Sequence, residues 1–220
     1  MNIQHLPALV NRAALVVAPI LFALSGVAVP ALKSGEVAQI ALIAAHPTGW
    51  YLFTMFSLVG SAALLPASIA LMQRTRVASP FCAIVGAGLL AVGGLVALAD
   101  SATQLVYWQM GAKGADPAQM AALGHRYENA AGASVIFMLG ALALVVGSVL
   151  VAAALVRAKA APAWAAVLVP AGLVLNIVSF VGSSRLLLIV SSLVLLAGMG
   201  RVALGDAPVS GRAAATASVQ

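Results

Sequence analysis

Apolar residues occur along this chain in six long stretches separated by short polar segments. Each stretch is about 20 residues long, which is the number of helical residues needed to cross the hydrocarbon core of a bilayer. The stretches lack the polar face that a surface helix of a soluble protein presents to water. The pattern therefore predicts an all-α, polytopic bundle of six transmembrane helices at about 13–29, 50–72, 81–106, 133–156, 162–181 and 186–204.

Composition supports one membrane domain rather than a soluble one. The 220 residues are 63% hydrophobic and only 7% charged, which leaves too little polar sequence to cover a water-soluble surface. The net charge of +6 comes from cations scattered through short loops, so nucleic-acid binding is not expected. We predict a single six-helix domain over residues 1–204 and a disordered tail over residues 205–220.

The distribution of lysine and arginine predicts the orientation. Cytoplasmic loops of membrane proteins carry an excess of these residues. Placing both termini in the cytoplasm puts seven of the 11 cations inside, namely Arg12, Arg74, Arg76, Arg157, Lys159, Arg201 and Arg212. The four outside are Lys33, Lys113, Arg126 and Arg185. We therefore expect both termini to be cytoplasmic.

The connection between the third and fourth stretches is the one substantial hydrophilic segment. Asp116, Pro117 and Gln119 have the spacing of a helix start, with an N-cap acid followed by proline in the first turn. We predict a short interfacial helix here, either covering a pocket as a lid or lying flat on the membrane. Residues 37–45 are also apolar and are expected to lie on the membrane or lead into the second span. Two aromatic pairs, 50–51 and 107–108, suit interfacial belts.

Asp100 is the main candidate for function. It lies inside the third apolar stretch, and ionisable groups in membrane segments are costly and usually functional. Gln104 and Tyr107 follow on the same helix face. In the predicted orientation the unusual polar residues gather on the outer side, which indicates an outward-facing pocket. Its candidate ligand-binding residues are His46, Asp100, Gln104, Arg126, Asn176 and Arg185.

Three chemistries fit this group. The side chains of His46, Asp100, His125 and Glu128 are candidates for a metal site. They are weak candidates because the sequence has no His-Glu-x-x-His motif. No cofactor is predicted. A membrane-embedded enzyme acting on a lipid-like substrate would use Asp100, His125 and Glu128 for acid–base catalysis. A proton- or ion-coupled transporter would use Asp100 alone.

A fourth interpretation is structural. Asp100 would form an ion pair with Arg126 or Arg185, and the histidines would be solvated. The protein would then be a scaffold or accessory subunit, with glycine- and alanine-rich helix faces available for a homo-oligomer. The leading hypothesis is a non-enzymatic protein of the lipid bilayer that binds a small or lipid-like ligand in the outward-facing pocket, or serves as such a scaffold.

Three segments resemble known proteins: HPTGWY at residues 46–51, DPAQMAAL at 116–123 and RAKAAPAWAAVL at 157–168. They are similar to segments of loosely related, uncharacterised bacterial six-helix integral membrane proteins. The resemblance covers most of the chain and implies a multi-pass protein of the bacterial inner (cytoplasmic) membrane. It implies no catalytic or binding residues.

Overall fold

The computed structural model describes residues 6–32 and 35–205, and within them the chain is helical, with no strand. The helices are α1 (Leu6–Ala28), α2 (Glu36–Ala45), α3 (Pro47–Thr75), α4 (Pro80–Met110), α5 (Pro117–Glu128), α6 (Ala131–Arg157), α7 (Ala163–Val181) and α8 (Arg185–Leu204). Six of them, all except α2 and α5, are long and apolar enough to cross a membrane, which confirms the predicted multi-pass bundle. Predictions for Lys33, Arg212 and the tail from residue 206 fall outside the described residues.

Most helix bounds lie close to the predicted ones, but α1 begins at Leu6 rather than at residue 13. It runs through the polar pair Asn11 and Arg12, which the hydropathy pattern excluded. Arg12 fits because its Nε donates a hydrogen bond to the carbonyl oxygen of Ala203 at 2.6 Å, at the end of α8. The polar residues therefore lie at the end of the bundle, where the helix leaves its apolar surroundings.

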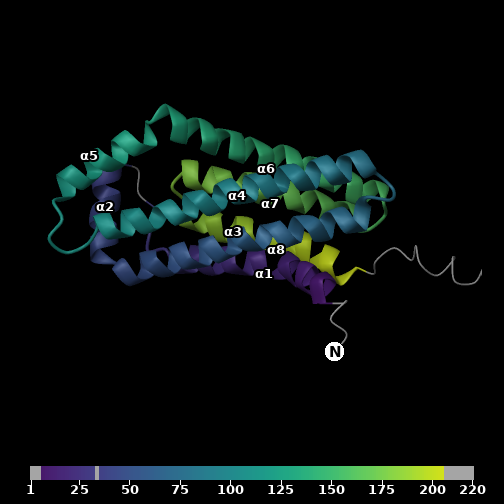
Figure 1. The fold of residues 1–220 in the computed structure, drawn as a ribbon. Coiled ribbons are helices and arrows are strands. Elements are labelled where there is room, and N and C mark those ends of the chain that lie inside the picture. Colours follow the sequence, from purple (N-terminus) through teal and green to yellow (C-terminus); the bar gives the residue numbers. More distant parts are fainter. Residues whose placement is uncertain (1–5, 33–34, 206–220) are drawn as a thin grey trace, which may run out of the picture.

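The six long helices run side by side (Figure 1), and their pairwise contacts close into a ring. Neighbours around the ring are α1, α3, α4, α6, α7 and α8, and α8 packs against α1. The start of α1 and the end of α8 lie together, and we call this the terminal end. The short helices α2 and α5 pack against each other at the opposite end, which we call the cap end (Figure 1).

Glycines allow the closest helix contacts. A Cβ atom added at Gly147 of α6 would lie 2.7 Å from the backbone nitrogen of Leu90 and 2.8 Å from the oxygen of Gly86, both in α4. In the α7–α8 pair, a Cβ atom at Gly198 would lie 2.9 Å from the oxygen of Ala165. The glycine-rich helix faces at Gly86, Gly147 and Gly198, which were candidates for contacts between copies of the chain, therefore form contacts between helices of one chain.

Helix α5 begins as the sequence indicated. Oδ1 of Asp116 accepts hydrogen bonds from the backbone nitrogens of Ala118 at 2.9 Å and Gln119 at 3.4 Å. Pro117 occupies the first turn, where its missing N–H costs nothing. The helix then packs on α2, so residues 37–45 and the hydrophilic connection fold together over one end of the ring.

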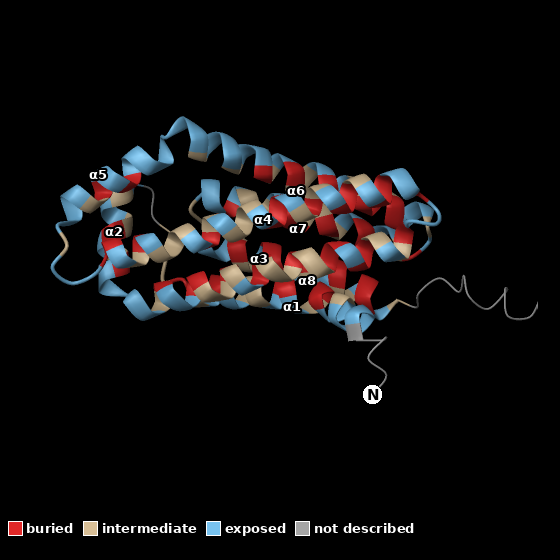
Figure 2. Ribbon diagram, viewed as in Figure 1, coloured by how far each residue is buried: buried red, intermediate tan, exposed pale blue. Residues whose placement is uncertain are grey.

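Helix α6 is packed over only part of its length. None of its residues 131–139 is buried, and Gly140 is the first buried position (Figure 2). From Gly140 onward, α6 lies against α4 through its small residues. The first part of α6, on the side of the cap end, therefore makes little contact with the ring.

Candidate functional site

A cavity of about 80 Å³ lies inside the ring and is lined by residues from all six long helices. It is large enough for several water molecules or a small chemical group. Its polar lining residues are Ser25, Ser57, Ser61, Asp100, Ser101, Gln104 and Asn176. Three of the predicted pocket residues, Asp100, Gln104 and Asn176, therefore line this central cavity.

Asp100 has no hydrogen-bond donor among the described residues, and its side chain is only partly exposed. The neighbouring polar groups are directed elsewhere. Oγ of Ser101 donates to the oxygen of Ala97 at 2.8 Å, and Nδ2 of Asn176 donates to Oγ of Ser191 at 3.5 Å. A carboxylate in such a cavity needs a partner or a proton, because a buried charge without one is unfavourable.

The predicted ion pair between Asp100 and an arginine is absent from the described residues, which contradicts the structural interpretation in that form. Arg126 donates through Nε to the oxygen of Ala122 at 3.4 Å, one turn earlier in α5. Arg185 donates to the oxygens of Gly26 at 3.1 Å and Val27 at 2.7 Å. These oxygens lie in the last turn of α1, where carbonyl groups lack helical partners and attract cations.

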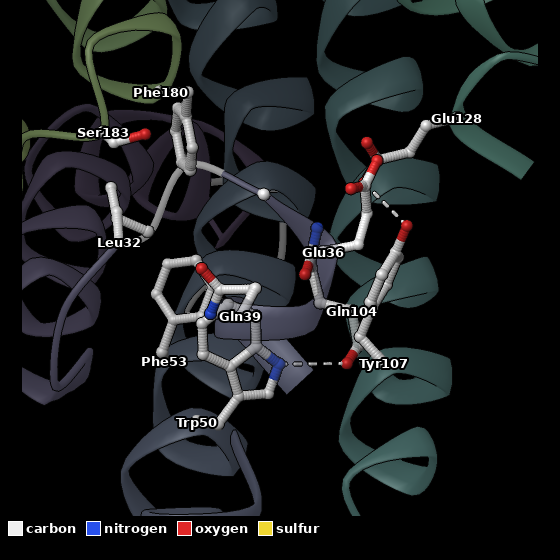
Figure 3. Close-up of a pocket in the computed structure, with 11 residues that line it drawn as sticks. Leu32, Glu36, Gln39, Trp50, Phe53, Gln104, Tyr107, Glu128, Phe180 and Ser183 are labelled. Atoms are coloured by element: carbon white, nitrogen blue, oxygen red, sulfur yellow. Dashed lines mark hydrogen bonds between the residues drawn. The ribbon is translucent and has the colours of Figure 1, made fainter. Parts of the chain in front are cut away.

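A second cavity, of about 210 Å³, lies on the cap-end side of the first. The two cavities share the lining residues Phe53, Gln104 and Phe180, so they adjoin each other, and we call the two together the path. We call the second one the vestibule. Its remaining described lining residues are Leu32, Gly35, Glu36, Gln39, Trp50, Tyr107, Glu128 and Ser183 (Figure 3).

Hydrogen bonds fix the walls of the vestibule. Oη of Tyr107 donates to Oε1 of Glu128 at 2.7 Å, which ties the end of α5 to α4 (Figure 3). Nε1 of Trp50 donates to the backbone oxygen of Gln104 at 3.3 Å and joins α3 to α4. Trp50 and Tyr107 are only 3% and 6% exposed, so these two members of the predicted aromatic pairs are wall residues, whereas the rings of their neighbours Tyr51 and Trp108 contact each other with 5.1 Å between centroids.

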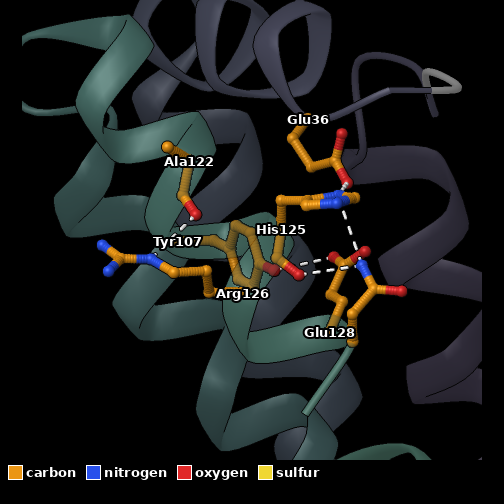
Figure 4. A network of polar contacts seen from close by, with 7 residues as sticks. Glu36, Tyr107, Ala122, His125, Arg126 and Glu128 are labelled. Atoms are coloured by element: carbon orange, nitrogen blue, oxygen red, sulfur yellow. Dashed lines mark hydrogen bonds and ion pairs between the residues drawn. The ribbon is translucent and has the colours of Figure 1, made fainter.

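The predicted catalytic and metal candidates do not come together. His125 lines neither cavity and contacts Glu36, with 2.9 Å between Nδ1 and Oε1 (Figure 4). His46 is exposed at the α2–α3 junction. Within residues 6–32 and 35–205, no three His, Cys, Asp or Glu side chains are close enough to hold a metal ion. Only Asp100 and Glu128 of the candidate set lie on the path.

The contact between Glu36 and His125 makes stability depend on pH. The pKa of Glu36 lies below its ordinary value of 4.5, chiefly because of the hydrogen bond with His125. A carboxyl group with a lowered pKa in the folded state stabilises that state above its ordinary pKa, and the contribution is lost as the pH falls through the lowered pKa. We expect Glu36→Gln to melt slightly below the wild type at neutral pH, and the difference to shrink as the pH falls below 4.5 and to disappear below the lowered pKa. A difference that persists in acid would contradict this assignment.

Toward the terminal end the path closes. A space of only about 10 Å³ follows the central cavity and shares Leu64, Leu173 and Leu195 with it. Its remaining lining is apolar except for Ser68. Because this volume holds no more than about one water molecule, the described residues close the path toward the terminal end here, whereas the vestibule continues it toward the cap end.

Several lining residues were not predicted from the sequence. Glu36 was assigned to a loop, and Phe53 and Phe180 looked like ordinary apolar residues of their spans. One feature of the sequence could have pointed to Glu36: this residue begins an apolar segment in a chain with only five acidic residues. Nothing local distinguishes Phe180 from a lipid-facing phenylalanine.

No family model, curated protein or solved structure matches this chain. The resemblance to bacterial six-helix membrane proteins therefore stays a prediction. The fold defines a multi-pass membrane protein, and the cavity is its most informative feature.

Proposed function

We propose that this protein binds a small or lipid-like ligand in the central cavity and admits it from the cap end. The observation that carries the proposal is a cavity bounded by six helices, with the Asp100 carboxyl group on its wall and no described donor bonded to it. Ligand sites in helical membrane proteins commonly lie between helices and use a few polar groups in an apolar lining. A ligand that bonds to the Asp100 carboxyl group would offset the free-energy cost of placing this group inside a membrane-spanning helix.

We further propose that the cap end faces outward across a bacterial inner membrane, with both termini in the cytoplasm and α5 at the outer interface. The described cations support this orientation. Six lie toward the terminal end: Arg12, Arg74, Arg76, Arg157, Lys159 and Arg201. Three lie toward the cap end: Lys113, Arg126 and Arg185. The excess at the terminal end is typical of a cytoplasmic side.

Ligand binding fits the geometry better than the two alternatives. An acid–base enzyme would need a second titratable group within hydrogen-bond reach of Asp100, but His125 lies outside the path, and Glu128 interacts with Asp100 only through its charge, from the wall of the vestibule. A transporter would need a route to the terminal end, and the lining there is apolar and closely packed. A binding site open at one end requires neither feature.

Native mass spectrometry of the protein released from mild detergent tests the proposal. The wild type is expected to retain a bound small molecule, and Ala97→Leu, which fills the central cavity, is expected to lose it. Ala102→Leu is the matched control, because Ala102 lies on the exposed side of α4. Equal retention by both variants, with unchanged melting temperatures, would show that the cavity is not the site.

A further inference from the structure

Resting on the proposed binding function, we propose that the ligand is a cationic amphiphile, such as a long-chain amine or quaternary ammonium compound. Its head group binds beside Asp100, and its alkyl chain leaves the path toward the lipid between α6 and α7. The central cavity is the binding site. The charge of its lining residues favours a cationic head group, and the loosely packed wall near the cap end gives the alkyl chain a way out.

The sign of the charge comes from the lining. The chain carries a net charge of +6 and only five acidic residues, yet Glu36, Asp100 and Glu128 all line the two cavities. No described Lys, Arg or His lines either cavity. An anion would meet like charges along this path, whereas a cation would be attracted inward. A neutral ligand would leave an ionised Asp100 without a counter-charge.

The lining favours an organic cation over a metal ion. Phe22, Phe53 and Phe180 border the central cavity, and Trp50 and Tyr107 border the vestibule. Aromatic faces bind ammonium groups, and bind them more strongly away from water. Hard metal cations instead need about six oxygen ligands, and the described residues provide no cluster of three acidic or histidine side chains.

The exit route of the alkyl chain is inferred from the part of the cavity wall that α6 and α7 form. Phe180 lines both cavities and is 44% exposed, and the next residue, Val181, is 84% exposed, so the last turn of α7 forms an open part of the wall. The short connection between α6 and α7 places the first part of α6 beside the last part of α7. Because residues 131–139 of α6 include no buried position, this side of the ring is loosely closed (Figure 2). An alkyl chain can extend there into the bilayer.

Binding of four probes to the full chain in phosphatidylcholine nanodiscs tests the proposal. Decyltrimethylammonium, decyl sulfate and decanol share one tail and differ in charge, and tetramethylammonium has the same head group without the tail. We expect saturable binding of decyltrimethylammonium above empty nanodiscs, none of decyl sulfate or decanol, and binding of tetramethylammonium that is about tenfold weaker or less.

Variants assign the binding to the cavity. Asp100→Asn is expected to weaken decyltrimethylammonium binding by about tenfold or more, because it removes one partner of a charge pair. Asp116→Asn is the matched control: it makes the same exchange at an exposed N-cap where asparagine also caps, and binding should not change. Should Asp100→Asn fail to fold, Glu128→Gln is expected to weaken binding severalfold.

The outcomes separate this inference from the proposed function. Saturable binding of decyl sulfate or decanol that Ala97→Leu abolishes would overturn the cationic ligand and leave the binding cavity standing. Equal affinities for tetramethylammonium and decyltrimethylammonium would overturn the tail. Binding that Asp100→Asn leaves unchanged in a folded protein would overturn the role of Asp100. The absence of any probe binding, together with no retained molecule in the mass spectrum, would overturn both proposals.

Discussion

Gly147→Ala is expected to lower the apparent stability of the bundle by about 1–3 kcal/mol, the usual cost of overpacking. The new Cβ atom would lie 2.7 Å from the backbone nitrogen of Leu90 and 2.8 Å from the oxygen of Gly86. Both are backbone atoms, so no side chain can rotate away and the two helices must move apart. Gly147→Leu is expected to yield no folded protein. Thermal unfolding in mild detergent, followed by circular dichroism, measures the effect.

Gly88→Ala is the control for this prediction. Gly88 lies on α4, the helix against which Gly147 packs, but a Cβ atom there meets nothing within 4 Å. Alanine favours a helix over glycine by up to about 1 kcal/mol, so the melting temperature should stay the same or rise slightly. If Gly147→Ala and Gly88→Ala melt alike, α4 and α6 do not pack through these glycines.

Arg74→Ala is expected to produce the second large effect, a loss of about 1.5–3 kcal/mol, the range for hydrogen bonds to a charged group. Nη1 of Arg74 donates to the oxygens of Val202 at 2.5 Å and Gly205 at 3.0 Å. These carbonyl groups lie at the end of α8, where the only backbone donor to Val202 among the described residues is the N–H of Gly205 at 3.3 Å, and the guanidinium also complements the negative end of the helix dipole. The substitution removes these bonds from α3 to the end of α8, which keeps only the backbone cap from Gly205 and the bond from Arg12 to Ala203.

Arg76→Ala removes an identical charge two positions along the chain. Arg76 is exposed, and no hydrogen bond or ion pair to another described residue involves its side chain. Both variants therefore alter the charge balance across the membrane equally, but only Arg74→Ala should lower the melting temperature and speed amide exchange at the end of α8. Equal destabilisation by the two variants would mean that the net charge, and not the cap, is responsible.

The sequence was sufficient to predict the number of long helices, because a bilayer allows few alternatives. Long apolar runs must form helices to satisfy their backbone groups. The start of α1 was missed because Arg12 looked like a boundary, whereas its partner, Ala203, lies at the other end of the chain. Contacts over such a sequence separation leave no local signal.

The candidate site could be predicted only in part, again because some of its contacts join distant parts of the sequence. Asp100 and Gln104 share a helix face by their spacing, and both line the central cavity. The residues His46, Arg126 and Arg185 lie near the cap end as expected but not on the path. The arginines bind backbone carbonyl groups, whose positions depend on how helices meet. Depth along a span can be predicted from a sequence, but the direction of a long side chain near a helix end cannot.

The central claim, a cavity that opens toward the outward-facing cap end and not toward the terminal end, is tested by cysteine accessibility in intact cells. In a Cys82→Ser background, Gln104→Cys probes the path and Lys159→Cys probes the terminal end. We predict that a membrane-impermeant thiol reagent added outside labels Gln104→Cys, and that Lys159→Cys reacts only after the cells are opened. Labelling of Lys159→Cys from outside, or of Gln104→Cys only from inside, would contradict the account.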